Sequence, residues 1–158
     1  MTEPDAGRRE TPEPVAEAES VVRISTDRAD LDLDWLHSAL SERAYWALGR
    51  SRQQVEAAVA GSLCFGAFIG AAQVGFARVV TDGATFGWIC DVFVDEGHRG
   101  RGVGSALMAA IVGHPSIIGL RRLALATRDA HELYRRFGFE TIAAPERWME
   151  RRPAPEAG

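Results

Sequence analysis

The chain has 158 residues, 46% of them hydrophobic, and a formal net charge of -4 at pH 7. This length and composition suit one compact domain with a sizeable core, and the acidic balance gives no support for nucleic-acid binding through a basic surface. All 18 basic residues are arginine. The lack of lysine excludes a Schiff-base mechanism and a phosphate loop of the Gly-Lys-Ser/Thr type.

The two ends of the chain differ in composition from its centre. Residues 1–20 carry six carboxylates against two arginines, together with three prolines and few large apolar side chains, which is typical of a disordered acidic arm. These charges account for the whole net charge, so the rest of the chain is formally neutral. We expect one folded domain over residues 21–152 and a flexible tail over residues 153–158.

The cysteine and histidine residues are dispersed. Cys64 and Cys90 are isolated within apolar stretches, and no apolar run approaches the ~20 residues of a membrane span. The N-terminus carries no signal-like apolar segment, so we expect a reduced, cytoplasmic protein without a membrane partner. The four histidines form no cluster with cysteines or carboxylates at metal-ligand spacing, and no metal is expected.

The first part of the expected domain contains two helices. A short strand over residues 21–24 precedes a helix over about 31–41, with Asp30 or Asp32 as its N-cap, and a second helix is expected over about 51–60. The connection between the helices holds Tyr45 and Trp46. These adjacent aromatic residues either cover the core or form the wall of a substrate pocket, because binding groups concentrate on connections.

The period of the apolar pattern then changes to two. Strands over residues 63–69, 74–80 and 85–94, joined by short turns, predict an antiparallel meander. Without a bulge, the third strand would place Ile89, Asp91 and Phe93 on the same face. A buried Asp91 would either accept structural hydrogen bonds or serve a site as a base or substrate anchor.

A glycine-rich loop follows the third strand. Gly100, Gly102 and Gly104 recur at two-residue spacing, and an apolar helical pattern begins at Val103. A helix that starts in such a loop leaves several backbone N–H groups unpaired near the positive end of its dipole. The loop is therefore expected to bind a phosphate group.

The remaining elements complete a mixed sheet. A fifth strand over residues 120–127 should run parallel to the preceding one, because a helix separates them. A short helix from Ala130 to Phe137 ends at Gly138, and residues 139–142 and 146–151 are expected to add further strands. The expected fold class is α/β (α+β), with a mixed, mostly antiparallel central sheet flanked by helices.

Two motifs resemble one protein family. Residues 99–104, Arg-Gly-Arg-Gly-Val-Gly, match the Gln/Arg-x-x-Gly-x-Gly/Ala signature of the GNAT superfamily of acyl-CoA-dependent N-acetyltransferases. About thirty residues later the chain is similar to the family's Ala-x-x-Leu-Tyr-x-x-x-Gly-Phe segment, at Ala130, Leu133, Tyr134, Gly138 and Phe139. The resemblance extends over residues 21–151 and implies a parallel strand pair at an acyl-CoA cleft.

The resemblance implies acetyl-CoA as the co-substrate. Backbone amides of residues 99–105 would hold its pyrophosphate, residues 92–94 would pair with its pantetheine arm, and Arg101 would either reach the 3′-phosphate or remain solvated. Thr127 stands where the family often has an asparagine, and its hydroxyl would replace part of that hydrogen bonding. The expected contact residues are Val92, Phe93, Val94, Arg99, Gly100, Arg101, Gly102, Val103, Gly104, Ser105, Thr127, Ala130 and Leu133.

The implied reaction is direct attack of a neutral primary amine on the acetyl thioester, through a tetrahedral intermediate. A backbone N–H near Phe93 or Val94 would polarise the thioester carbonyl. Tyr134 would protonate the departing thiolate, since an ordinary tyrosine stays protonated at neutral pH. Asp91 is the first candidate for the base that deprotonates the amine, and His37, from the first helix, is the second.

No sequence motif identifies the acceptor. Glu42, Asp91, Tyr45 and Trp46 suit a small cationic amine, and a metabolite, an antibiotic or a protein N-terminus all fit. A homodimer is also plausible. One alternative is a non-catalytic acyl-CoA-binding module, and another is a Rossmann-type dinucleotide protein, although Ser105 occupies the third glycine position of that motif.

Overall fold

The computed structural model describes residues 21–154. The acidic arm expected at residues 1–20 and the last part of the expected tail, residues 155–158, lie outside the described residues. The principal elements are β1 (Val22–Ser25), α1 (Leu33–Ser38), α2 (Arg52–Ala60), β2 (Leu63–Ile69), β3 (Ala72–Thr81), β4 (Phe86–Val94), α3 (Val103–Val112), α4 (Pro115–Ile118), β5 (Arg122–Leu125) and α5 (His131–Arg135).

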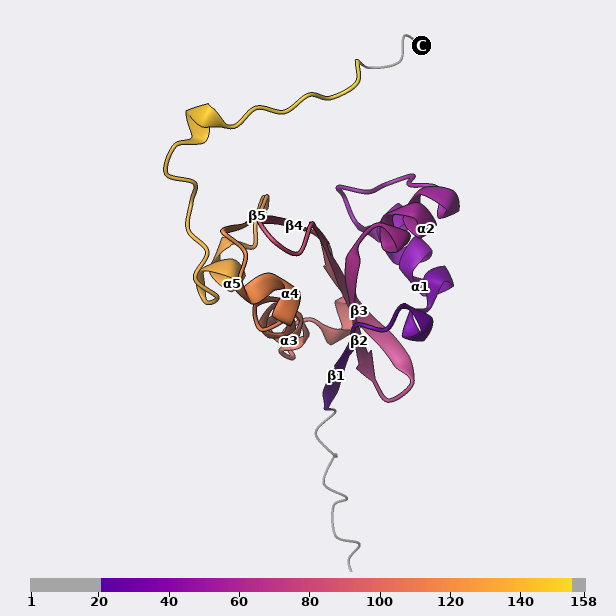
Figure 1. Cartoon of the computed structure of the whole chain (residues 1–158). Helices are drawn as coiled ribbons and strands as arrows, with labels where there is room; N and C mark the ends of the chain where they lie inside the picture. Colours follow the sequence, from indigo (N-terminus) through magenta and orange to yellow (C-terminus); the bar gives the residue numbers. More distant parts are fainter. Residues whose placement is uncertain (1–20, 155–158) are drawn as a thin grey trace, which may run out of the picture.

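The five strands form one sheet in the order β1-β2-β3-β4-β5. Neighbouring strands are antiparallel except β4 and β5, which are parallel, as expected for strands separated by a helix. Figure 1 shows α1 and α2 on one face of the sheet and α3, α4 and α5 on the other. The predicted fold class is confirmed.

Each face of the sheet has its own hydrophobic core. The core beneath α3 includes Phe65, Leu107, Met108 and Ile111. The core beneath α1 and α2 includes Leu36, Leu40, Phe76 and Phe93. Burying each such side chain contributes roughly 1.5–3 kcal/mol, so both helical layers are held to the sheet chiefly by apolar packing.

The helix starts follow local capping signals. The carboxylate of Asp32 accepts the amide of Trp35 at 2.9 Å, which selects Asp32 from the two predicted caps of α1. Ser51 and Gln54 form a capping box at the start of α2. The observed helix is shorter than the one predicted over 31–41: α1 ends at Ser38, and a π-helical turn over Ala39–Arg43 follows it.

A β-bulge interrupts β4. Its register against β3 shifts between Phe76 and Arg78, so two residues of β4, Asp91 and Val92, oppose a single residue of β3. Asp91 adopts a φ of 53°, and it is the only non-glycine residue with a positive φ among those described. The extra residue reverses the side-chain alternation from this point onward.

The bulge overturns the predicted facing of β4. Ile89 packs in the core beneath α3, whereas Phe93 packs in the core beneath α1 and α2. Ile89, Asp91 and Phe93 therefore do not share one face, as uninterrupted alternation would require. The alternation of side chains along a strand predicts their face of the sheet only where each residue opposes a single residue of the neighbouring strand.

The parallel strands β4 and β5 separate close to the bulge. Their pairing runs from Phe86 and Arg122 to Ile89 and Leu125, and stops there. From Cys90 onward, the edge of β4 that faces away from β3 has no partner strand within residues 21–154. The sheet thus opens into a cleft just before the glycine-rich loop.

The part of the chain after α3 differs most from prediction. Residues 115–119, expected to be a connection, contain the short helix α4, and β5 is four residues long. The strands predicted at 139–142 and 146–151 are wrong: after β5, the described residues contain only α5 and a 3-10 turn over Pro145–Arg147. Figure 1 shows the segment after α5 running away from the body of the domain.

Candidate active site

The glycine-rich loop has the backbone conformation of an anion site. Gly100 and Gly102 have φ angles of 73° and 80°, and α3 begins immediately afterwards at Val103. Nothing lies within 4 Å of the position a Cβ would take at either glycine, so the left-handed backbone, and not crowding, requires glycine here. No side chain caps the start of α3, which leaves its first amides free to bind an anion.

The arginines of the loop differ in their surroundings. The Nε of Arg99 donates to the carbonyl oxygen of Val94 at 3.2 Å, and its guanidinium lies 5.9 Å from the ring centroid of Phe93. Arg99 therefore ties the loop to the end of β4. Arg101 is exposed, so its side chain is accessible to a ligand at the loop.

Helix α5 connects the loop to the cleft. A Cβ at Gly104 would lie 3.5 Å from Cδ2 of Leu133, so the first turn of α3 packs beside α5. The hydroxyl oxygen of Thr127 accepts the amide of Ala130 at 3.0 Å, just before α5 begins. Thr127 therefore orders the start of α5, and its hydroxyl keeps its proton and one lone pair for a ligand in the cleft.

A cavity of about 230 Å³ occupies the opening between β4 and β5. The turn that holds Tyr45 and Trp46 forms one wall, and α5 forms another. The remaining lining residues are Trp88, Ile89, Cys90, Asp91, Val92, Leu125, Ala126, Thr127, Asp129, Ala130 and Tyr134. The predicted pocket residues Tyr45 and Trp46 and the predicted acid Tyr134 thus line one cavity.

Tyr134 is the most buried of these aromatic residues, with 8% of its surface exposed. Burial raises the pKa of its hydroxyl, and the neighbouring Tyr45 and Asp129 raise it further, because each disfavours a second negative charge. Tyr134 therefore keeps its proton over the physiological range and is able to donate it.

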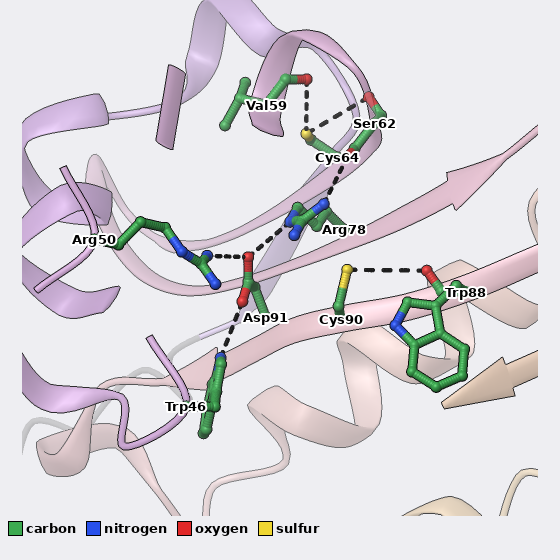
Figure 2. Close-up of polar contacts among 9 residues, drawn as sticks. All are labelled: Trp46, Arg50, Val59, Ser62, Cys64, Arg78, Trp88, Cys90 and Asp91. Atoms are coloured by element: carbon green, nitrogen blue, oxygen red, sulfur yellow. Dashed lines mark hydrogen bonds and ion pairs between the residues drawn. The ribbon is translucent and has the colours of Figure 1, made fainter. Parts of the chain in front are cut away.

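Asp91 lies at the centre of a hydrogen-bonded cluster, shown in Figure 2. Oδ2 accepts from Arg50 at 2.6 Å and from Arg78 at 2.7 Å, and Oδ1 accepts from the indole N–H of Trp46 at 2.9 Å. Arg78 also donates to the hydroxyl of Ser62 at 3.1 Å. The cluster joins β3, β4 and the turn before α2 around the bulge.

This environment does not suit a general base. Burial by itself raises the pKa of Asp91, but the hydrogen bonds and charges of Arg50 and Arg78 outweigh it and hold the pKa below its usual value. One carboxylate against two guanidiniums also leaves a local charge of about +1, so Asp91 does not attract a cationic amine. The cluster favours the structural alternative for Asp91 over the predicted catalytic one.

Two further expected contributors lie away from the cavity. The Nε2 of His37 is 3.1 Å from the carbonyl oxygen of Arg50, and His37 does not line the cavity. Glu42 accepts from the hydroxyl of Ser38 and also lies outside the lining. His37 lies in α1 and Glu42 in the π-helical turn that follows it.

Sequence reasoning missed several residues of the site. Trp88, Cys90 and Asp129 line the cavity, and Arg50 and Arg78 hold Asp91. Burial raises the pKa of the Cys90 thiol to about 11. The sequence signal for this cluster was weak, since the bulge that brings Cys90 and Asp91 to the cavity leaves no residue-type signature.

Two features are absent from the described residues. Within residues 21–154, no three histidine, cysteine or carboxylate side chains are grouped so that they could hold a metal ion. No helix in the same part of the chain is both long and apolar enough to cross a membrane.

The site is that of a group-transfer enzyme. An anion-binding helix start lies at one end of an open strand edge, and a protonated tyrosine lies beside a small acceptor-sized cavity at the other. This arrangement suits acyl transfer from a carrier that bears a phosphate group.

Comparisons with known proteins identify the family. A family model described as an acetyltransferase (GNAT) domain matches residues 60–141. A curated protein of Gibberella zeae, whose name assigns it to the acetyltransferases, is 32% identical over 134 residues, covering 70% of this chain and 74% of that protein. The chain therefore belongs to the GNAT family of acetyltransferases, and it is an acyltransferase.

Solved structures agree with this family. A GNAT-family acetyltransferase from Xanthomonas campestris is 47% identical, with a TM-score of 0.82 over 84% of this chain and 94% of that one. An acetyltransferase from Clostridium acetobutylicum, crystallised with acetyl-CoA, is 14% identical and shares the fold, with a TM-score of 0.62 over 84% of this chain and 95% of that one. These matches favour an enzyme over both alternatives raised by the sequence.

Proposed function

We propose that the protein transfers an acetyl group from acetyl-CoA to the primary amine of a small acceptor. The observation that carries this proposal is the position of Tyr134, which is buried and protonated in the cavity where β4 and β5 separate. Its neighbour Leu133 contacts the first turn of α3, beside the anion-binding amides.

The residues of the cleft fit acetyl-CoA. The free amides of residues 102–105 and the positive backbone angles of Gly100 and Gly102 suit a pyrophosphate. The unpaired edge of β4 beyond Ile89 offers backbone groups for the amide-containing pantetheine arm. Acetyl-CoA supplies an activated thioester, and the chain positions that thioester beside Tyr134.

The transfer is direct, from thioester to amine. The amine nitrogen bonds to the acetyl carbon through a tetrahedral intermediate, the carbon–sulfur bond breaks, and the amine proton passes to solvent. Cys90 lines the cavity but does not carry the acetyl group, because a thiol with a pKa of about 11 is almost wholly protonated at neutral pH.

Tyr134 protonates the departing thiolate, and the resulting tyrosinate regains a proton from solvent, to which the amine has lost its own. The raised pKa of Tyr134 keeps its hydroxyl protonated at neutral pH before each turnover. A backbone N–H on the open edge of β4, near Phe93 or Val94, polarises the carbonyl in the same step. Asp91 acts indirectly, as a positioning residue that holds Trp46 and the bulge in place.

The cavity limits the size of the acceptor. Pockets for drug-sized ligands have volumes of roughly 300–1,000 Å³, and the volume here is about 230 Å³. Its walls combine aromatic and aliphatic side chains with two carboxylates: Asp91, which two arginines neutralise, and Asp129, which is exposed. The acceptor is therefore a small amine, or the amine-bearing end of a longer molecule.

Replacing Tyr134 by phenylalanine tests the proposal. Release of free CoA is measured with a panel of primary amines, and acetyl-CoA affinity is measured by calorimetry. The variant should lose about 10²–10³-fold in kcat, in the range for removal of a general acid, while its acetyl-CoA affinity stays within about threefold of wild type.

Two results would contradict this assignment. Unchanged turnover in Tyr134→Phe would remove Tyr134 from the chemistry. Acetyl-CoA binding without thiol release for any amine in the panel would indicate a binding module that lacks transfer activity.

A further inference from the structure

Asp129 is a second carboxylate of the acceptor cavity, and its surroundings differ from those of Asp91. The Asp91 side chain is 2% exposed and accepts from two arginines at 2.6 and 2.7 Å. The Asp129 side chain is 66% exposed, so of the two carboxylates that line the cavity Asp129 lies at its mouth and Asp91 at its floor. The contact of Asp129 with the neighbouring Arg128 is 3.8 Å, which is longer than a hydrogen bond. In the described chain, the oxygens of Asp129 thus remain available to a ligand.

The ring of Tyr45 holds Arg128 beside the cavity and not within it. The guanidinium carbon of Arg128 lies 3.8 Å from the centroid of this ring, a close cation–π contact. Tyr45 and Asp129 line the cavity, whereas Arg128 does not. The ring of Trp46 packs edge-on against that of Tyr45, with centroids 4.9 Å apart, and its indole N–H is bound to Asp91. This stack joins the two sides of the cleft and keeps Arg128 from closing onto Asp129.

We propose that Asp129 binds the ammonium group of the acceptor at the mouth of the cavity, and so selects protonated alkyl amines over uncharged molecules of the same shape. The inference rests on the proposed acetyl transfer, because it defines the acceptor of that reaction. A carboxylate beside the rings of Tyr45 and Trp46 offers an ammonium group both an ion pair and a cation–π contact. Tyr45 also engages Arg128, the cation of the chain that would otherwise compete for Asp129.

The charge that lines the cavity changes from its mouth to its floor. At the mouth, the carboxylate of Asp129 favours the protonated form of an amine. At the floor, one carboxylate against two guanidiniums leaves a local charge of about +1, which favours the neutral form. An ammonium group bound at Asp129 is in contact with solvent, which takes its proton as the amine moves inward. The amine therefore reaches Tyr134 in its nucleophilic form.

Binding to the full chain loaded with CoA tests Asp129 without acetyl transfer. The probes are benzylamine, an ammonium ion at pH 7, and benzyl alcohol, its uncharged counterpart, and calorimetry gives both affinities. Asp129→Asn should lose about three- to fivefold in benzylamine affinity, the upper part of the range for an exposed ion pair, while its benzyl alcohol affinity is unchanged. Glu132→Gln removes an exposed carboxylate that does not line the cavity, so this matched control should bind both probes as wild type does.

A double substitution tests the role of Tyr45. Tyr45→Leu removes the stack and lets Arg128 pair with Asp129, so the ratio of benzylamine affinity to benzyl alcohol affinity should fall. Adding Arg128→Gln removes the competing cation and should restore most of that ratio. If the ratio stayed low in the double variant, Tyr45 would not be what keeps Asp129 available.

The assignment of Asp129 would be overturned by either of two results. One is a wild type that binds benzylamine no more tightly than benzyl alcohol, and the other is an unchanged ratio of affinities in Asp129→Asn. Because CoA carries no acetyl group, this test is separate from the turnover test of Tyr134→Phe. A lack of acetyl transfer together with an intact preference for benzylamine would contradict the proposed reaction and leave the role of Asp129 standing.

Discussion

At the scale of single residues, one buried environment keeps two side chains neutral, with opposite consequences for catalysis. Tyr134 and Cys90 line the same cavity, and burial raises the pKa of both. For the tyrosine this preserves the proton that a departing thiolate needs. For the cysteine it suppresses the thiolate that a covalent acetyl-enzyme would need.

Cys90→Ala separates the two mechanisms. Direct transfer predicts kcat/KM within about threefold of wild type, because the thiol only fills space, and it predicts no burst of CoA in rapid-quench experiments. Tyr134→Phe, measured alongside, shows the size of a true catalytic loss. A fall of about 10²-fold or more in Cys90→Ala, with acetyl-CoA affinity intact, would instead implicate the thiol in transfer.

At the scale of secondary-structure elements, the sequence predicted the features that depend only on neighbouring residues, such as helix starts and glycine turns. Asp32 and Ser51 cap helices with their own side chains, and the left-handed residues Gly100 and Gly102 are glycines. The bulge was missed because its left-handed residue is Asp91, which is held there by Arg50 and a neighbouring strand. Such a conformation depends on contacts between distant segments, which no local pattern encodes.

Gly102→Ala tests whether the glycine-rich loop requires its left-handed backbone. A left-handed backbone costs an alanine about 1–2 kcal/mol, so the variant should be less stable by that amount and should bind acetyl-CoA more weakly as the loop relaxes. Gly119→Ala is the matched control: a Cβ there also meets nothing within 4 Å, and the backbone φ is -89°. Equal stability and affinity in both variants would show that the amides do not require this conformation.

At the scale of the whole molecule, the antiparallel meander and the parallel pair of strands could be predicted, but the pairing of β1 with β2 and the path of the C-terminal segment could not. The meander and the parallel pair follow from connection lengths along one chain. Residues 146–151 have strand-like composition, yet they form no strand in the described chain. A strand forms only where an edge is available to it, and composition does not say which edge that is.

Two ion pairs help to fix helices α1 and α2 to the sheet above the site. Apart from apolar packing, Arg50 bridges the turn before α2 to Asp91, and Arg43 bridges the end of the preceding π-helical turn to Asp95 at 2.7 Å. Asp91 is the more consequential partner, because its side chain is 2% exposed and that of Asp95 is 25% exposed. Solvent screens the second pair more than the first.

Asp91→Asn should therefore destabilise the domain in a pH-dependent way. Removing one partner of a buried ion pair costs about 3 kcal/mol or more, since it leaves Arg78 and Arg50 without their counter-charge. The folded-state pKa of Asp91 is lowered, so its stabilisation is complete above the unfolded value near 3.9 and is lost as the pH falls through the folded value. The stability difference between wild type and variant, measured by urea denaturation, should be largest at pH 7 and shrink below about pH 4.

The matched control is Asp34→Asn, which removes an ion pair with Arg52 from a carboxylate that is 90% exposed. Its effect should stay below about 1 kcal/mol, because exposed pairs contribute little. If Asp91→Asn lost as little stability as this control, or if its loss of stability did not change with pH, the Asp91 cluster would not be what holds α1 and α2 to the sheet. If the cluster does hold the helices to the sheet, Asp91→Asn also loosens Trp46 and lowers kcat.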